Sequence, residues 1–526
     1  MKRIFAILCA VVAAASCGKD RVDTGPSVPR DGDGGSEHDM IVLGRQLDDP
    51  YSVKNVEKAV KSLYPEMAGR VDVTPTDTYV RFLPKDGEEF DRLRSMGIDM
   101  TDHPLDYQIL REGDYYHDPS LPEEDITWQY AVVPYGFELP EGIRTEILDQ
   151  CYISRPEATR ASSGIDWEAV EREAYRLTGN GDMLLPRTKA EGVEPSGRIT
   201  ITDPLFNGGA PFGVSGVMVC CNSFVRFSYC HTDRDGYYQM KERFASEPRY
   251  RLVFKNDKDF SIGFNLILVP ASVSSFGKGS PEGINVNVTN ESDNRLFRRC
   301  VVNNAVYEYI SRCSEEDMGI KAPPRDLRIW IFKNLSASSS VMLHHGAIVD
   351  RVPLENYLGA YKTLLKAFLP DITIGTGGSD SYAEIYGAVV HELAHASHYA
   401  QVGNDYWDCF IRYIVTSFLS TGGKSYGDGT GTYAGHCEVG EMWAYFMQSK
   451  MFMERYGGPS PTFGTSWWFY PQILRYLDER GMTRSQIYRS LSSDVTSRKK
   501  LQDKMIDLFP EHKQMIDQVF GRYGGM

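Results

Sequence analysis

The sequence lacks several features that would assign it to a common class. It has no excess of basic residues, because 57 Lys and Arg stand against 71 Asp and Glu, which gives a net charge of -14. This balance argues against a nucleic-acid partner. After residue 17 no apolar run is long enough to span a membrane. The chain of 526 residues contains only 10 cysteines, and their spacings match no zinc ribbon.

The strongest apolar run stands at the N-terminus. It follows two basic residues, extends from Ile4 to Ala15 and ends in Ala-Ala-Ser-Cys at Cys17. Such a segment is typical of a signal peptide, and the cysteine resembles a bacterial lipobox, with Ala14 where leucine is usual. We therefore expect residues 1–17 to be a lipoprotein signal, with a lipid on Cys17 that anchors the chain at the outer membrane or cell surface. Residues 18–38 have little apolar content and predict a flexible tether. A plain secretory signal with an incidental cysteine is the alternative.

One short segment, GAVVHELAHASHYAQ at residues 387–401, places three histidines and a glutamate in apolar surroundings. On a helix, His391 and His395 project from one face, one turn apart, and can converge on a single cation. Glu392 lies at the edge of that face. A zinc hydrolase needs two neutral nitrogen ligands, an open position for water and a carboxylate that takes the water's proton. The His-Glu-x-x-His pattern therefore predicts a zinc site with Glu392 as the general base.

A buried helix that carries these side chains without a metal is the alternative interpretation. The apolar surroundings argue against it, because unpaired buried polar groups cost several kcal/mol. His398 does not fit as a third ligand, since seven helical residues separate it from His391 by about 10.5 Å along the axis. The glycine and later histidine of the metzincin pattern are also missing. We expect His398 to support a ligand or to pack in the core.

Residues 435–457, GHCEVGEMWAYFMQSKMFMERYG, predict a second helix with carboxylates at Glu438 and Glu441. This segment resembles the gluzincin metallopeptidases, in which the third ligand is a glutamate followed three residues later by a small residue. The resemblance implies Glu441, which precedes Ala444 by three positions, as the ligand, with Glu438 as the fallback. Tyr445 stands where several gluzincins have an acidic residue that orients a histidine, so the orienting residue is unassigned.

The loop between the two helices, residues 420–436, is rich in Gly and Ser and contains two tyrosines and a histidine. A tyrosine hydroxyl or an imidazole beside a metal site can stabilise the oxyanion of a tetrahedral intermediate. The gluzincin resemblance makes Tyr433 the first choice for a catalytic residue, with His436 and Tyr426 as further candidates. A glycine-rich loop without a catalytic role is the alternative.

The remaining sequence predicts a multidomain α+β protein. Residues 39–195 read as an N-terminal α+β domain with a helical linker, acting as a scaffold or as a prodomain-like cap. A helix near Val53–Leu63 and strands near 79–83 and 128–133 are expected there. If the domain is a cap, the residues that could block the metal site are Cys151, His103 and His117. The alternative is that each of them is an ordinary core or surface residue.

Residues 196–280 alternate apolar and polar side chains between Gly and Asp-Gly breaks, which predicts a β-sandwich. The turn at residues 232–238 resembles that of the carboxypeptidase regulatory-like, transthyretin-type domains. Residues 281–526 are expected to form a mainly α, zincin-like catalytic domain. Within it, Leu327–Phe332 predicts a strand above the cleft, to which an extended peptide would add.

The layout resembles the zinc metallopeptidase lipoproteins of the Bacteroidetes. It predicts a surface-anchored zinc endopeptidase that cleaves extracellular proteins or glycoproteins. The alternative is a surface binding or adhesion lipoprotein whose zinc site is structural or degenerate. A fourth protein ligand, such as Cys437 or Glu438, would favour that alternative, because structural zinc sites are closed by four protein ligands.

Overall fold

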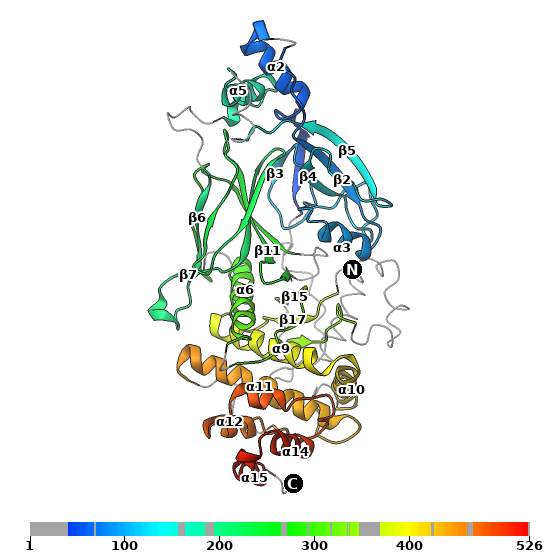
Figure 1. The fold of residues 1–526 in the computed structure, drawn as a ribbon, viewed down its shortest axis with the longest axis vertical. Coiled ribbons are helices and arrows are strands. Elements are labelled where there is room, and N and C mark those ends of the chain that lie inside the picture. Colours follow the sequence, from blue (N-terminus) through cyan, green and yellow to red (C-terminus); the bar gives the residue numbers. More distant parts are fainter. Residues whose placement is uncertain are drawn as a thin grey trace, which may run out of the picture.

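The computed structural model describes residues 40–523 with internal gaps. The gaps are 68–69, 156–163, 185–193, 265–270, 292–293, 316–317, 334, 336, 347–368, 422–425, 459 and 461–466. The predicted signal peptide, the tether and Cys17 lie outside the described residues. Central sheets separate an N-terminal sheet region from a mainly helical C-terminal region, which confirms the predicted multidomain α+β class (Figure 1). Among the described residues, no helix has both the length and the apolar character needed to cross a membrane.

The described residues of the N-terminal region form two small antiparallel sheets and three α-helices. Its elements are β1 (Val42–Gln46), α2 (Val53–Leu63), β2 (Asp77–Leu83), α3 (Gly87–Ser95), β3 (Tyr107–Arg111), β4 (Gln129–Pro134), β5 (Arg144–Cys151) and α5 (Trp167–Leu177). The strand order is β4-β2-β5 in one sheet, and β1 pairs with β3 in the other. The apolar faces of α2 and α5 meet around Val56, Val60 and Val170. The predicted helix at Val53–Leu63 is confirmed.

Two larger sheets follow in the chain. The four-stranded sheet contains β6 (Ser196–Ile201), β7 (Phe212–Gly213), β10 (Tyr237–Gln239) and β14 (Val286–Val288). The eight-stranded sheet contains β8 (Val217–Ser223), β9 (Arg226–His231), β11 (Arg249–Asn256), β12 (Phe260–Phe264), β13 (Val273–Lys278), β15 (Leu327–Phe332), β16 (Ser339–Ser340) and β17 (Ile372–Gly375). Both sheets contribute side chains to one apolar core, for example Ile199 from β6 and Leu252 from β11.

The larger sheet crosses the domain boundary that the sequence predicted near residue 280. Its order is β16-β17-β15-β12-β11-β8-β9, and β15 pairs in parallel with both β12 and β17. All six residues of β15 are buried, as expected for a strand inside a parallel sheet. The expectation that a peptide adds to β15 is therefore wrong, because both of its edges are occupied. Among the described strands, the terminal one on this side is β16.

The C-terminal region packs helices against the central sheets and against one another (Figure 1). These helices are α6 (Asn294–Arg312), α9 (Tyr382–Val402), α10 (Asn404–Thr421), α11 (Ala434–Tyr456), α12 (Gln472–Glu479), α13 (Arg484–Arg489), α14 (Arg498–Leu508) and α15 (Lys513–Gly521). Their apolar side chains belong to the same core cluster as those of the two larger sheets. The eight cysteines in the described part of the chain are all free thiols.

The N-terminal region shares a core with the central sheet. The turn between β8 and β9 inserts Phe224 and Val225 into an apolar cluster that also contains Tyr79. Outside this cluster, Asp114 forms an ion pair with Arg295 of α6 at 2.7 Å. A cap that detaches would expose Phe224 and Val225 to water. The structure therefore supports the scaffold interpretation of this region over the cap interpretation.

Candidate metal centre

Helix α9 carries the two histidines of the His-Glu-x-x-His segment. It begins after Ser381, whose hydroxyl accepts a hydrogen bond from the backbone N–H of Glu384 at 3.2 Å. It ends at Gly403, whose φ of 80° favours glycine. His391 and His395 lie one turn apart on one face, with their ring centroids 4.8 Å from each other. The histidines therefore converge as the spacing predicted.

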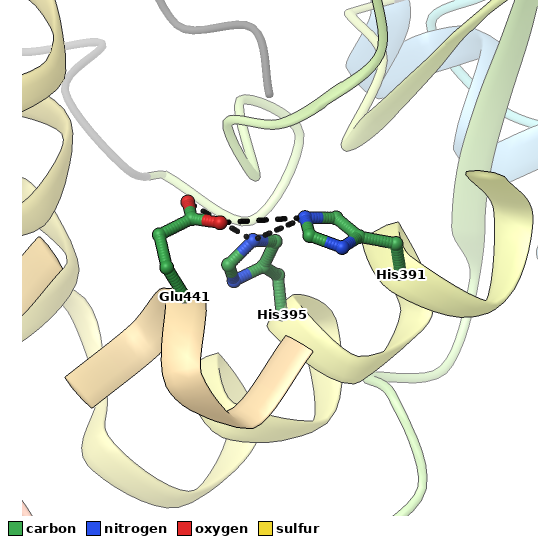
Figure 2. Close-up of side chains that lie close together, drawn as sticks. All are labelled: His391, His395 and Glu441. Carbon is green, nitrogen blue, oxygen red and sulfur yellow. Dashed lines mark hydrogen bonds and ion pairs between the residues drawn. The ribbon is translucent and has the colours of Figure 1, made fainter. Parts of the chain in front are cut away.

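Helix α11 crosses α9 in the antiparallel sense and brings Glu441 to the two histidines (Figure 2). The close contact of the helices is fixed by buried aromatic side chains, and Trp443 donates a hydrogen bond to the carbonyl of Ala394 at 3.1 Å. His395 and Glu441 are fully buried, and His391 is 4% exposed. Three polar side chains thus meet inside the core, where each needs a partner.

The separations of the three donor atoms match those around a small cation. His391 Nε2 and His395 Nε2 are 3.2 Å apart, and the Glu441 carboxylate oxygens lie 3.5 Å and 3.4 Å from them, respectively (Figure 2). Ligands held about 2.0 to 2.1 Å from one tetrahedral ion are about 3.3 Å from each other. The group His391, His395 and Glu441 could therefore hold a metal ion.

The charge state of Glu441 suits a metal ligand. Burial alone would raise its pKa, but the adjacent imidazoles of His395 and His391 outweigh that effect and lower the pKa to about 2. The group is therefore ionised over the whole physiological range, and a carboxylate must be ionised to bind a cation.

Glu392 is buried on the same turn of α9 as the two histidines. It is 1% exposed, and its Oε2 has no hydrogen-bond partner among the described residues. Burial raises its pKa to about 8, against a smaller opposing effect of His391. Its backbone carbonyl accepts a hydrogen bond from the Ser340 hydroxyl at 2.6 Å, so β16 lies directly beside this turn of α9. Strand β16 thus lies next to the turn of α9 that carries His391 and Glu392.

Glu438, the fallback ligand, faces a different part of the molecule. Its carboxylate accepts a hydrogen bond from the backbone N–H of Arg498 at 2.8 Å, at the start of α14. It is absent from the group of residues that could hold a metal, and so is Cys437, which is buried beside it on α11. The described residues thus provide three protein ligands.

Tyr433 and His436 do not join the three ligands. Tyr433 precedes α11 with a φ of 69° and is 38% exposed, with its ring 5.5 Å from that of His436. The imidazole of His436 lies against Tyr406, at 4.5 Å between ring centroids. No contact in the described part of the chain links either residue to His391, His395 or Glu441, so their predicted catalytic roles gain no support from the geometry.

The second tyrosine candidate, Tyr426, contacts a residue that packs against one of the metal ligands. The Tyr426 hydroxyl is 3.1 Å from that of Tyr445, whose ring packs edge-on against His391 with centroids 4.6 Å apart. The sequence singled out Tyr445 only as a departure from the gluzincin pattern.

Two residues that contact the site escaped the sequence analysis. Gln448 lies 3.2 Å from His391 Nδ1, and Ser340 bonds to the backbone of Glu392. Gln448 follows Glu441 by seven residues, two helical turns along the same face of α11, so helix periodicity was a usable signal. No local pattern marks Ser340, because it approaches α9 from a distant strand.

The three candidate blocking residues of the N-terminal region are also engaged elsewhere. Cys151 is fully buried in the cluster around Tyr79, and His103 lies between Asp102 and Arg251. A third, His117, lies with its ring Nε2 3.2 Å from a backbone carbonyl. Among the described contacts, none links them to the metal ligands, which agrees with the alternative that the three are ordinary core or surface residues.

His398 packs in the core, as expected. It is fully buried against Tyr406 and Trp407, and neither ring nitrogen has a hydrogen-bond partner among the described residues. Burial lowers its pKa to about 3. A neutral imidazole in this position makes the folded state sensitive to acid, since the unfolded chain accepts a proton near pH 6.5.

We expect His398→Phe to make the protein more resistant to acid. The pKa of His398 is lower in the folded state, so wild-type stability is lost as the pH falls from about 6.5 towards about 3. Two pH units below 6.5, the loss is about 2 to 3 kcal/mol. Urea unfolding of both metal-free proteins at about pH 7 and about pH 4.5 measures it. Equal pH dependence in the two proteins would contradict this assignment.

No protein-family model, curated protein or solved structure matches this chain. The resemblance to gluzincins and to the zinc metallopeptidase lipoproteins of the Bacteroidetes therefore remains a prediction from the sequence motifs.

Proposed function

We propose that this chain is a zinc-dependent endopeptidase. The observation that carries the proposal is the buried group His391, His395 and Glu441, whose donor atoms lie 3.2 to 3.5 Å apart, with the Glu392 carboxylate on the same turn of α9. Two imidazoles and one carboxylate are the protein ligands of many catalytic zinc sites, which leave a fourth position for water or substrate.

The side chains have distinct roles in this proposal. His391 and His395 bind as neutral imidazoles through Nε2, and Glu441 binds as a carboxylate. Zinc held there supplies a Lewis acid that polarises a peptide carbonyl and lowers the pKa of water. Glu392 accepts the proton of the attacking water and returns a proton to the leaving amine, so the peptide bond breaks with the addition of one water molecule.

Strand β16 lies against α9 at Glu392, but both of its residues are buried, and the carbonyl of Ser340 accepts a hydrogen bond from Trp407. The proposal therefore does not include pairing of a substrate peptide with this strand. We propose extracellular proteins or glycoproteins as substrates, as the resemblance to the metallopeptidase lipoproteins implies. The N-terminal segment supports attachment of the chain to the membrane through a lipid on Cys17.

One observation favours a second candidate function. The three ligands are buried almost completely, and none of these residues is more than 4% exposed. A surface binding protein with a structural or degenerate metal site would show such burial. That candidate needs a fourth protein ligand, and neither Cys437 nor Glu438 belongs to the cluster in the described structure.

A cleavage screen tests the proposed function. The zinc-loaded protein is incubated with intact proteins, glycoproteins and peptide libraries, and the products are identified by mass spectrometry. We expect internal cleavage of intact proteins, loss of cleavage on chelation and recovery on addition of zinc. Release of dipeptides alone, with proteins untouched, would identify an exopeptidase. Absence of cleavage together with four protein ligands in the zinc-loaded structure would favour the binding protein.

A further inference from the structure

The second ring nitrogen of His391 has a defined neighbour. Its Nδ1 lies 3.2 Å from Oε1 of Gln448, a residue of α11 that is 7% exposed. Because Nε2 of His391 faces Glu441 and His395, the lone pair of Nε2 points at the metal position and Nδ1 carries the proton. Gln448 Oε1 therefore accepts a hydrogen bond from His391 Nδ1.

The amide of Gln448 is itself held in place. Its Nε2 donates a hydrogen bond to the hydroxyl of Ser460 at 3.2 Å, and Ser460 is 3% exposed. This contact directs Oε1 towards His391. Gly387, one turn before His391 on α9, provides the space, because a Cβ at this position would lie 3.2 Å from Gln448 Nε2. The hydrogen bond to Ser460 and the space left by Gly387 thus favour one orientation of the Gln448 amide.

A neutral acceptor suits the charge of this site. Glu441 is fully buried and Glu392 is 1% exposed, so together they can provide two negative charges to balance a divalent cation. A carboxyl group in place of the Gln448 amide would have to bind a proton, because an unpaired buried charge is strongly destabilising, and its carbonyl oxygen would still accept the hydrogen bond. An amide oxygen accepts the same hydrogen bond without adding charge.

We propose that Gln448 is a positioning residue that selects the tautomer and ring orientation of His391 and thereby sets the metal affinity of the site. The acceptor atom is Oε1 of Gln448, which lies two helical turns after the ligand Glu441 on α11. The inference rests on the metal-binding part of the proposed function and is independent of hydrolysis.

Replacement of Gln448 by methionine or by glutamate tests this role. Gln448→Met keeps the length and removes the acceptor, whereas Gln448→Glu retains an acceptor oxygen. By competition with a chromophoric chelator, zinc affinity is expected to fall about 10- to 100-fold in the methionine variant. It should stay within about threefold of wild type in the glutamate variant. The visible absorption spectrum of the cobalt-substituted protein, which reports ligand geometry, should change in the methionine variant alone.

Ser449→Ala is the matched control, since Ser449 is the next residue of α11 and is 5% exposed. It should leave zinc affinity and the cobalt spectrum unchanged. Wild-type affinity and spectrum in Gln448→Met, or equally weak binding in the methionine and glutamate variants, would overturn the inference. If Gln448→Met does not fold, Gln448→Asn withdraws the acceptor and keeps the polarity, and unchanged affinity there is equally decisive. A wild-type protein that binds no zinc would overturn both this inference and the proposed function.

Discussion

Glu392→Gln is expected to lower the rate of peptide hydrolysis by about 10² to 10⁴ while zinc still binds. Glutamine keeps the shape of the side chain but cannot accept the proton of the attacking water. His391, His395 and Glu441 remain in place, so the metal ligands are unchanged. The measurements are kcat/KM on a protein substrate and the zinc content of the purified variant. Full activity in the variant would refute the role assigned to Glu392.

The same substitution has a second expected effect, on stability. The carboxylate of Glu392 is 1% exposed and its Oε2 has no hydrogen-bond partner in the described structure. Burial raises the pKa of the Glu392 carboxyl group to about 8, and above this pH the folded wild-type protein holds a buried charge that lowers its free energy of unfolding. The metal-free glutamine variant should therefore unfold at the same or a higher temperature than wild type at alkaline pH. Gross destabilisation would indicate a structural role, and loss of activity would then carry no mechanistic meaning.

Glu441→Gln is expected to weaken zinc binding by more than about 100-fold, because changes in residues that only support a ligand already cost about 10- to 100-fold. Glu438→Gln is the matched control, since it makes the same chemical change three residues earlier on α11. That variant should keep zinc affinity and lose the charged acceptor at the start of α14, at a cost of about 1 to 2 kcal/mol in unfolding free energy. Chelator competition and urea unfolding of both variants measure the two effects. The reverse pattern would make Glu438 the ligand.

The sequence predicted the elements that carry the site because their signals are local. The spacing of His391 and His395 places both on one face of any helix, and the apolar residues around them require that helix to be buried. Glu438 and Glu441 could not be separated in this way, since residues three apart lie on neighbouring parts of a helix surface. Their difference comes from Arg498, whose backbone N–H reaches Glu438 from a helix some sixty residues later.

For a related reason, local sequence patterns could not predict which strands pair with each other. The buried apolar run Leu327–Phe332 predicted a strand correctly, but its parallel partners are β12 and β17, which lie on either side of it in the chain. Such pairings depend on which segments meet in space, and hydrophobic periodicity carries no information about them. The domain boundary expected near residue 280 failed for this reason, since parallel pairing joins β12 to β15 across it.

The insertion of Phe224 and Val225 into the N-terminal core constrains the order in which the chain folds. The first core is incomplete until residue 225 is available, and the large sheet is incomplete until β17 has been added to β15. Both events require contacts between segments far apart in the sequence, and such contacts form slowly. We therefore expect helices α9 and α11 to assemble late in the synthesis of the chain, after the sheet that supports them.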